Sequence, residues 1–378
     1  MNILVLGGGG REPAIAWALA KSPRTDSLYV APGNGGTDGI AQNVPDLNPE
    51  DGQAVLAFVR ENAIDFVVIG PEAPLVAGVA DVLRAAGVPT FGPDAQGAQL
   101  EGSKTFSKKF MDANDIPTAR YASFTDLEPA LAYVRELGAP IVVKADGLAA
   151  GKGVVVADEL EDAEDAVRSC FDGAFGDSGK TVLIEECLTG PECSMLAFVS
   201  DGKAHCMATA QDHKRAFDGD RGPNTGGMGA YSPVPIVTPD ELAAMHDIME
   251  RAAVATAREF DNDYRGVLYG GFMLTPEGPK IIEFNARFGD PETQVVLPRL
   301  ESDLADIMLA VAEGRPDDID LRWSEQWAVC VVLASEGYPG SYEKGKVILG
   351  IDEAEQIEGV TVFHAGTAKN FDDELVTA

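Results

Sequence analysis

The chain has 378 residues, 45% of them hydrophobic, which predicts two or three folded domains and excludes a disordered chain. Its 29 Lys and Arg against 61 Asp and Glu give a net charge of −32, which argues against non-specific binding to nucleic acid or anionic lipid, although local cations or a metal ion would still hold a small phosphorylated substrate. No apolar run approaches the roughly 18 residues of a membrane helix, so we expect no membrane partner.

The first part of the chain, up to about residue 93, alternates between short apolar strands and helices. Strands are predicted at residues 2–6, 27–30, 65–69 and 90–91, and helices at 12–21, 52–62 and 75–86. This alternation predicts a parallel sheet covered on both faces. Ligands of such sheets bind at the carboxyl ends of the strands, which here carry residues 7–11, 32–34 and 70–74.

The middle of the chain is typical of an antiparallel α+β unit. Helices are predicted at 104–114, 127–137, 160–171 and 239–260, and strands at 141–144, 154–157, 182–186, 193–199 and 205–210. A turn at 275–278 joins the strands 266–274 and 280–288 into a hairpin. Residues 313–327 are typical of a linker, and strands at 329–334 and 360–364 begin a third, small β-containing module.

The segment 280–288, K-I-I-E-F-N-A-R-F, has the strongest local pattern. Because strand side chains alternate between faces, Glu283, Asn285 and Arg287 share one face. The opposite face is apolar and should pack on a core; it carries Ile282, Phe284, Ala286 and Phe288. Carboxylate and amide oxygens suit Mg²⁺, and a guanidinium suits a phosphoryl group. The alternative is a strand with a solvated polar face, and periodicity alone does not decide between the two.

A lysine closes the apolar strand 141–144, and a glycine-rich loop follows it. A lone ammonium at Lys144 is costly there, and a bound phosphate would offset that cost. Gly147, Gly151 and Gly153 let backbone amides approach an anion closely. The spacing is not that of a Walker A loop, and the Gly-Lys-Thr at 179–181 is interpreted as a turn because Ala174 stands at the upstream glycine position.

The N-terminal glycine run does not fit a nicotinamide cofactor. Gly7 and Gly9 match G-x-G, but Glu12 occupies the third glycine position, and the second strand lacks a ribose-binding acid. We instead expect a monophosphate at the amides that begin the first helix, beside Arg11.

Two further stretches are unusual, Q-D-H-K-R at 211–215 and G-P-N-T-G-G-M-G at 222–229. The first packs donors, acceptors and charge into five residues, and the second has more glycine than a turn needs. The alternative is a mobile surface loop. His213 by itself is more typical of a packed or surface histidine than of a general base.

Five cysteines, an odd number without a C-x-x-C pair, indicate free thiols in a reducing cytoplasm. They are Cys170, Cys187, Cys193, Cys206 and Cys330. Four scattered histidines argue against a zinc site.

Together these motifs closely resemble the phosphoribosylamine–glycine ligase family, ATP-grasp enzymes of purine biosynthesis. The resemblance extends over essentially the whole chain and rests on residues 9–12, 32–34, 70–75, 100–104, 143–153, 184–186, 211–215, 222–229 and 283–292. D-H-K-R followed by G-P-N-T-G-G-M-G is far more specific than a lone glycine pattern.

The resemblance implies an α/β fold in three parts. These are an N-terminal parallel-sheet domain (1–100), an α+β ATP-grasp domain (101–315) with a lid subdomain at about 118–190, and an apparently incomplete C-terminal module (325–378). It implies ligation of glycine to 5-phosphoribosylamine, with ATP giving ADP and phosphate. A carboxylate oxygen is a poor leaving group, so phosphorylation to glycyl phosphate would precede attack by the amine, with water kept out by the glycine-rich lids.

The resemblance also assigns site residues. For ATP it implies Lys104, Lys144, Gly151, Lys152, Gly153, Glu185, Glu186, Cys187, Leu188 and Glu192. For Mg²⁺ or Mn²⁺ it implies Glu283 and Asn285, with Arg287 near the γ-phosphate. For the phosphoribosyl substrate it implies Gly9, Gly10, Arg11, Glu12, Gly33, Asn34 and Glu72. For the glycine and amine side it implies Asp212, Lys214, Gly226, Gly227 and Gly229.

The chain departs from the family pattern in two places. Pro13 stands where the family usually has His, and the chain ends where the family's last module is about half complete, so we expect an uncovered sheet face there. We expect a cytoplasmic monomer that binds small molecules and no nucleic acid.

Two alternative functions are considered. One is another ATP-grasp enzyme, such as a biotin carboxylase or a formyl- or carboxyl-transferring purine ligase, which should lack the two specific runs at 211–215 and 222–229. The other is a non-catalytic nucleotide-binding module.

Overall fold

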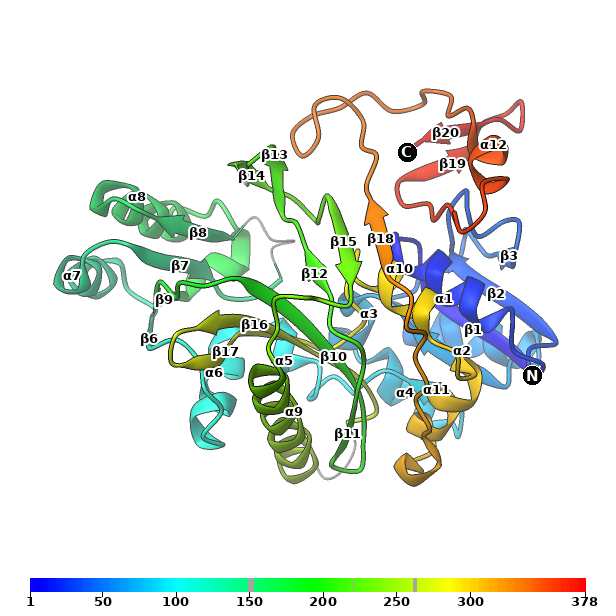
Figure 1. Cartoon of the computed structure of the whole chain (residues 1–378), viewed down its shortest axis with the longest axis horizontal. Helices are drawn as coiled ribbons and strands as arrows, with labels where there is room; N and C mark the ends of the chain where they lie inside the picture. The colour runs from blue at the N-terminus through cyan, green and yellow to red at the C-terminus, as the bar shows by residue number, and fades with distance from the viewer. Residues whose placement is uncertain (149–152, 220, 261–263) are drawn as a thin grey trace.

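The N-terminal part of the chain forms a five-stranded parallel sheet with the strand order β3-β2-β1-β4-β5 (Figure 1, right). The computed structural model describes residues 1–148, 153–219, 221–260 and 264–378. The strands are β1 (Asn2–Gly7), β2 (Ser27–Pro32), β3 (Gln42–Asn43), β4 (Phe66–Ile69) and β5 (Thr90–Phe91). The predicted parallel sheet is confirmed, with β3 as an edge strand that the sequence did not indicate.

Both faces of this sheet are covered, as its continuous apolar strands predicted. Ile3 and Val5 pack against α1, whereas Leu4 and Leu6 pack against α2 and α4, because neighbouring strand residues point to opposite faces. The helices are α1 (Arg11–Leu19), α2 (Gly52–Glu61), α3 (Glu72–Val76) and α4 (Val79–Ala85). The single helix predicted at 75–86 is wrong: Gly78, at φ +78°, separates α3 from α4.

A second, four-stranded antiparallel sheet has the order β6-β9-β7-β8 and lies at the far side of the molecule (Figure 1, left). It falls within the residues expected to form a lid. Two helices pack on one face, against Ile141 and Val143, which leaves Lys144 and Glu185 on the other. The elements are β6 (Tyr121–Phe124), α7 (Leu127–Leu137), β7 (Ile141–Ala145), β8 (Val154–Ala157), α8 (Leu160–Phe171), the 3-10 turn η1 (Gly176–Lys180) and β9 (Val182–Glu186).

A third sheet, β11-β10-β16-β17, forms the centre of the molecule. Alternate residues of β10 serve two cores: Met195 packs with α9, whereas Phe198 packs with α11 and the N-terminal domain. The elements are β10 (Glu192–Ser200), β11 (Lys203–Cys206), β16 (Gly266–Thr275), β17 (Gly278–Asn285), α9 (Pro239–Glu259) and α11 (Leu304–Ala312). The predicted hairpin of β16 and β17 is confirmed.

A bulge in this hairpin alters the expected faces of β17. Gly271 pairs with Glu283 but Phe272 pairs with Ile281, so Ile282 is the extra residue. The prediction that Ile282 lies on the core face is wrong: Ile281 is fully buried in the core and Ile282 is half-buried at the cavity. Beyond the bulge, Phe284 is in the core as predicted.

Short elements connect these sheets. Helices α5 (Gln99–Gly102) and α6 (Lys104–Ala113) follow the N-terminal domain, and β12-β15-β18 join the centre to the C-terminal part. The remaining elements are β12 (Gln211–Asp212), β13 (Arg215–Phe217), β14 (Arg221–Asn224), β15 (Gly229–Ser232), α10 (Thr293–Val296), η2 (Leu297–Arg299) and η3 (Pro316–Asp318).

The C-terminal part lies against the N-terminal domain (Figure 1, orange and red). The strand predicted at 329–334 corresponds to β18 (Ala328–Val331), but the strand predicted at 360–364 is wrong, because that segment carries no strand pairing. The other elements are α12 (Ile351–Glu355), β19 (Thr367–Lys369) and β20 (Leu375–Thr377). No helix in the described ranges combines the length and apolarity needed to cross a membrane.

Candidate functional site

One cavity of about 2160 Å³ lies where the sheets and the C-terminal part meet. Lys144, Glu283 and Asn285, which come from two different sheets, all line it. The cations that line it include Arg11, Lys104, Lys108, Lys144, Lys214, Arg215 and Arg287, together with Lys21, Arg299 and Lys346. The expectation that the motif cations gather around one cleft, despite the net charge of −32, is therefore confirmed.

Lys144 is not the lone ammonium that the sequence suggested. Its Nζ lies 2.8 Å from Oε1 of Glu185, and Lys108 Nζ lies 2.9 Å from Oε2 of the same carboxylate. All three side chains are at most 5% exposed. The sequence could not show this, because the partners come from different elements: Lys144 from β7, Glu185 from β9 and Lys108 from α6.

Lys104 ties the start of α6 to the glycine-rich loop. Its Nζ donates to the Gly147 carbonyl at 2.7 Å. Burial lowers its pKa, although Glu283 opposes that shift. Gly153 lines the cavity, whereas Gly151 and Lys152, both predicted for ATP, lie outside the described residues.

The end of β9 leads into the cavity wall formed by Glu186, Cys187 and Leu188. The Glu186 carboxylate accepts a hydrogen bond of 2.8 Å from Arg120 Nε. Glu192 accepts a hydrogen bond of 3.1 Å from Lys214 Nζ. Glu192, predicted to bind the ribose, and Lys214, predicted for the glycine side, are therefore neighbours.

Glu283 and Asn285 offer the cavity two oxygen donors on one strand. Burial alone would raise the Glu283 pKa, but the net shift is downward because Lys214, Lys144 and Lys104 surround the carboxylate. No cluster of three or more His, Cys, Asp or Glu suited to a metal occurs in the described part of the chain. An ionised carboxylate with one amide fits Mg²⁺ or Mn²⁺, whose other positions are taken by water and phosphate.

Arg287 joins the two halves of the cavity. Its Nη2 lies 2.7 Å from Glu101, and its Nε lies 3.5 Å from Glu72 Oε2. The same Glu72 oxygen is 3.7 Å from Nη2 of Arg11. The Glu101 and Glu72 carboxylates hold the Arg287 pKa above its usual range despite burial. Glu72 therefore stands between the N-terminal and central cations.

The N-terminal glycine loop already binds carboxylates. The Gly9 amide donates to Glu12 at 2.5 Å, and the amides of Gly10 and Arg11 donate to Asp290 Oδ2 at 3.0 and 3.1 Å. The amides that we expected to be free for a monophosphate are therefore occupied by side chains. Burial, reinforced by Asp290, raises the Glu12 pKa to about 7, with Arg11 opposing it.

Of the other residues predicted for the phosphoribosyl substrate, Gly33 and Asn34 lie behind the loop rather than in the cavity lining. Asn34 Nδ2 donates to the carbonyls of Gly8, Gly9 and His364, which fixes the loop to the C-terminal part. In the described lining, Gly10, Arg11 and Glu72 are present and Gly9, Glu12, Gly33 and Asn34 are not.

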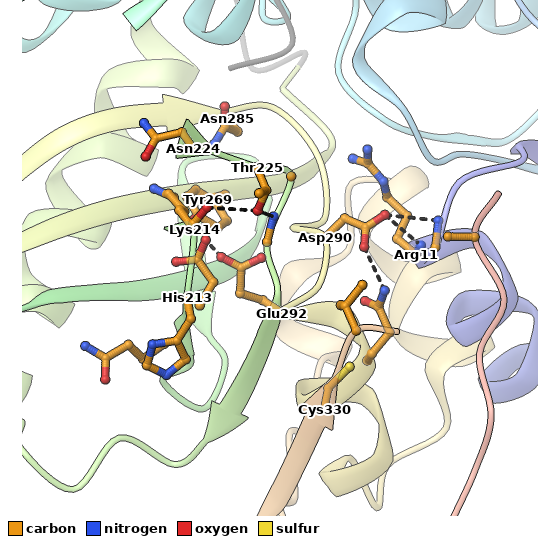
Figure 2. A pocket seen from close by; sticks show the side chains of 18 of the residues that line it. Arg11, His213, Lys214, Asn224, Thr225, Tyr269, Asn285, Asp290, Glu292 and Cys330 are labelled. Atoms are coloured by element: carbon orange, nitrogen blue, oxygen red, sulfur yellow. Dashed lines mark hydrogen bonds between the residues drawn. The ribbon is translucent and has the colours of Figure 1, made fainter. Parts of the chain in front are cut away.

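Glu292, a buried glutamate, lies across the cavity from Arg11 (Figure 2). Glu292 Oε1 accepts from Ser194 Oγ at 3.0 Å and from Tyr269 OH at 2.8 Å. Burial and the Glu292 charge raise the Asp212 pKa, with Lys214 opposing the shift. The Lys214 pKa lies above its usual range because nearby carboxylates, Asp212 first, outweigh burial.

Some glycines of the segment 222–229 line the cavity, and another belongs to a strand. Gly226 and Gly227 line the cavity, and the Gly226 amide donates to the Tyr338 hydroxyl at 3.0 Å. Gly229 instead pairs with Val331 in the β15–β18 ladder. At the start of the run, the alternative of a surface loop is correct about exposure, but the segment is a strand, because β14 pairs with β13.

No role was predicted for Lys108, Ser194, Tyr269, Asp290 or Glu292. Asp290 and Glu292 belong to the motif at residues 283–292, so their acidity beside Arg287 was an available signal. Lys108 and Tyr269 had no such signal, because a single lysine in a helix and a tyrosine in an apolar strand are common in proteins and indicate no particular function.

Comparison with known proteins gives three consecutive family matches. Residues 1–101 match the model of the phosphoribosylglycinamide synthetase N domain, residues 102–293 its ATP-grasp (A) domain, and residues 328–378 its C domain.

Similar proteins and structures agree with these matches. A phosphoribosylamine–glycine ligase of Agrobacterium fabrum is 55% identical over 97% of this chain and 86% of the relative, and one of Vibrio parahaemolyticus is 51% identical over 100% and 88%. The crystal structure of a phosphoribosylamine–glycine ligase from Thermotoga maritima is 34% identical with a TM-score of 0.84, covering 100% of this chain and 90% of that one. A biotin carboxylase domain from Hydrogenobacter thermophilus, 17% identical with a TM-score of 0.73 over 100% and 85%, shares the fold.

Proposed function

Because the chain belongs to the phosphoribosylglycinamide synthetase family, it is an ATP-dependent ligase that joins glycine to 5-phosphoribosylamine in purine biosynthesis, and we propose that the reaction runs through glycyl phosphate in the cavity described above. The observation that carries this proposal is the convergence of Lys104, Lys144, Glu283, Asn285 and Arg287 on that cavity. These groups match the charge of a triphosphate and a metal, although the protein as a whole is strongly acidic.

The nucleotide lies, in this proposal, between the sheet that carries Lys144 and the hairpin that carries Glu283. Lys104 and Lys144 neutralise its phosphates, and the segment from Glu185 to Leu188 meets the base. Glu192, held by Lys214, is placed to accept hydrogen bonds from the ribose hydroxyls. Gly151, Lys152 and Gly153 complete the phosphate loop in the proposal.

Glu283 and Asn285 would hold the divalent metal ion, Mg²⁺ or Mn²⁺. When bound there, such an ion supplies positive charge to the phosphate oxygens. Arg287 supplies further charge from the neighbouring position, and its pairs with Glu101 and Glu72 hold the guanidinium in place.

In the activation of glycine, the main role of the protein is to position the carboxylate and the γ-phosphate, since no protein group forms a bond to either. A glycine carboxylate oxygen attacks the γ-phosphorus, the bond to the bridging oxygen breaks, and ADP leaves. The amine nitrogen then attacks the carbonyl carbon, the bond to the phosphate oxygen breaks, and inorganic phosphate leaves with one proton lost from nitrogen. Asp212 is our candidate acceptor for that proton, because burial and Glu292 raise its pKa.

The phosphoribosyl substrate enters, in this proposal, from the side of Gly10, Arg11 and Glu72. Glu72 lies between Arg11 and Arg287, so it links this side to the nucleotide. Gly226 and Gly227 close the glycine side. Pro13 follows Glu12 inside α1, where a proline at the first turn is benign.

ADP release, with each substrate omitted in turn, tests the mechanism. We expect steady ADP formation only with glycine and phosphoribosylamine together, and at most about one ADP per enzyme when the amine is omitted, because a trapped acyl phosphate blocks further turnover. Steady ADP formation without glycine would reject glycyl phosphate as the intermediate.

A cytoplasmic location, a monomeric state and the absence of nucleic-acid partners stay predictions. All five cysteines are free, which supports a reducing compartment.

A further inference from the structure

Lys108 is a buried cation to which the mechanism above gives no role. Its Nζ donates to Thr118 Oγ1 at 2.7 Å and lies 2.9 Å from Glu185 Oε2. The Thr118 hydroxyl in turn donates to the Ile281 carbonyl at 2.7 Å. A threonine hydroxyl has one hydrogen, so its lone pairs must face Lys108. This chain of hydrogen bonds fixes the position of the ammonium.

Glu185, the partner of Lys108, has one oxygen to spare. Its Oε1 lies 2.8 Å from Lys144 Nζ, but this ion pair lacks hydrogen-bond geometry, and the oxygen is buried without a hydrogen-bond partner in the described structure. Glu185 is 3% exposed and lines the cavity. A carboxylate oxygen has two lone pairs, so Oε1 can accept an N–H group from a ligand in addition to its contact with the Lys144 ammonium.

Lys108 and Lys144 both lie against the Glu185 carboxylate, and a carboxylate accepts hydrogen bonds. The exocyclic amino group of adenine is a donor. We infer that Lys108 is a positioning residue that holds Glu185 as the acceptor for the 6-amino group of the bound purine. The inference rests on the proposed ATP site, since Glu185 is the first residue of the segment that meets the base in that proposal.

Replacement of Lys108 would weaken the preference for a purine that carries a 6-amino group, because it changes the position of Glu185. In Lys108→Met the Glu185 carboxylate keeps only Lys144, and the side chain loses the contact with Lys108 that orients it. The alternative is that Lys108 only fastens α6 to β9. That role would change stability but would not change discrimination between nucleotides.

The test compares ATP with purine riboside triphosphate, which differs from ATP only by lacking the 6-amino group. For the wild type we expect kcat/KM to favour ATP by about 10- to 100-fold, the size of one hydrogen bond to a charged acceptor. In Lys108→Met this preference should fall to within about threefold. In Lys109→Met, an exposed lysine on the same helix, it should stay unchanged.

A double variant shows whether Lys108 acts through Glu185. In a Glu185→Gln background, Lys108→Met should change the preference by less than about twofold, because the charged acceptor is already gone. An equal loss from Lys108→Met in both backgrounds would overturn the inference. So would a Lys108→Met enzyme that retains the full wild-type preference.

Two further outcomes stay distinguishable. If Lys108→Met fails to fold, Thr118→Val removes the group that holds the ammonium, and it should lower the preference in the same direction; an unchanged preference in a folded Thr118→Val enzyme overturns the inference. A wild type that releases no ADP from ATP would reject the proposed function itself. A wild type that uses both nucleotides equally would reject only the role of Lys108.

Discussion

The two ends of the cavity hold charge in opposite ways. At the nucleotide end Lys108 and Lys144 pair with Glu185, and Lys104 lies near Glu283, so ammonium groups line this part of the cavity. At the N-terminal end the amides of residues 9–11 donate to the carboxylates of Glu12 and Asp290. An anion at the first end meets ammonium groups, whereas an anion at the second must compete with the protein's own carboxylates for the backbone amides.

This contrast teaches that a glycine loop at a helix start is not by itself an anion site. Backbone amides attract carboxylates as readily as phosphates, and Asp290 reaches them from 280 residues away in sequence.

Glu283→Ala should have the largest effect, because it removes the charged metal donor at the nucleotide end. We expect kcat to fall by about 10³-fold or more, with the thermal midpoint nearly unchanged. The matched control is Glu277→Ala, an exposed glutamate at the tip of the same hairpin. Unchanged turnover in Glu283→Ala would reject the proposed metal site.

Arg11→Met tests the N-terminal end. Arg11 is the cation there, so we expect KM for phosphoribosylamine to rise by about 10- to 100-fold while KM for ATP changes by less than about threefold. Arg60→Met, on the exposed side of α2, serves as the control. An equal rise in both KM values would contradict the division of the cavity into two ends.

Glu12→Gln should raise stability at alkaline pH. The folded-state pKa of Glu12 is about 7, above its ordinary 4.5, so its contribution to stability is complete below about pH 4.5 and is lost as the pH rises through about 7. The glutamine keeps the acceptor for the Gly9 amide and carries no charge. We expect the variant to be more stable by about 1–3 kcal/mol at pH 8.

Thermal midpoints of Glu12→Gln and wild type, measured without substrates from pH 5 to pH 8, check this sign. The wild-type midpoint should fall more steeply as the pH rises. Parallel curves would show that the Glu12 carboxyl does not titrate differently in the folded and unfolded protein.

Asp290→Asn should have the smallest effect. The amide oxygen still accepts from Gly10 and Arg11, but the negative charge beside them is gone, so an anionic ligand competes more easily. We expect KM for phosphoribosylamine to fall by about threefold to tenfold, which corresponds to about 1 kcal/mol. A rise in that KM would indicate that the carboxylate helps to bind the substrate, and the phosphate would then lie elsewhere.

Several elements could be predicted from the sequence because their information is local. The strands of the N-terminal sheet and the hairpin of β16 and β17 follow from continuous or alternating apolar residues. Elements with weak local signals were missed or misplaced. Helix α11 was not predicted, and the bulge at Ile282 depends on register with β16 rather than on any residue of β17.

The same distinction between local and long-range information applies to the site. The residue types for phosphate and metal binding, Lys144, Glu283, Asn285 and Arg287, were evident in the sequence, since their positions follow from strand periodicity and motif. Their electrostatic partners were not, because Glu185, Glu101 and Glu72 reach them only after different elements pack together.

The family, most of the parallel and antiparallel strands, and many of the polar groups that line the cavity could be predicted from the sequence alone. The pairing of those groups with one another became known only from the packing of distant elements. Whether a buried lysine or a backbone amide is available depends on what lies within about 3 Å of it, and those neighbours come from distant parts of the chain.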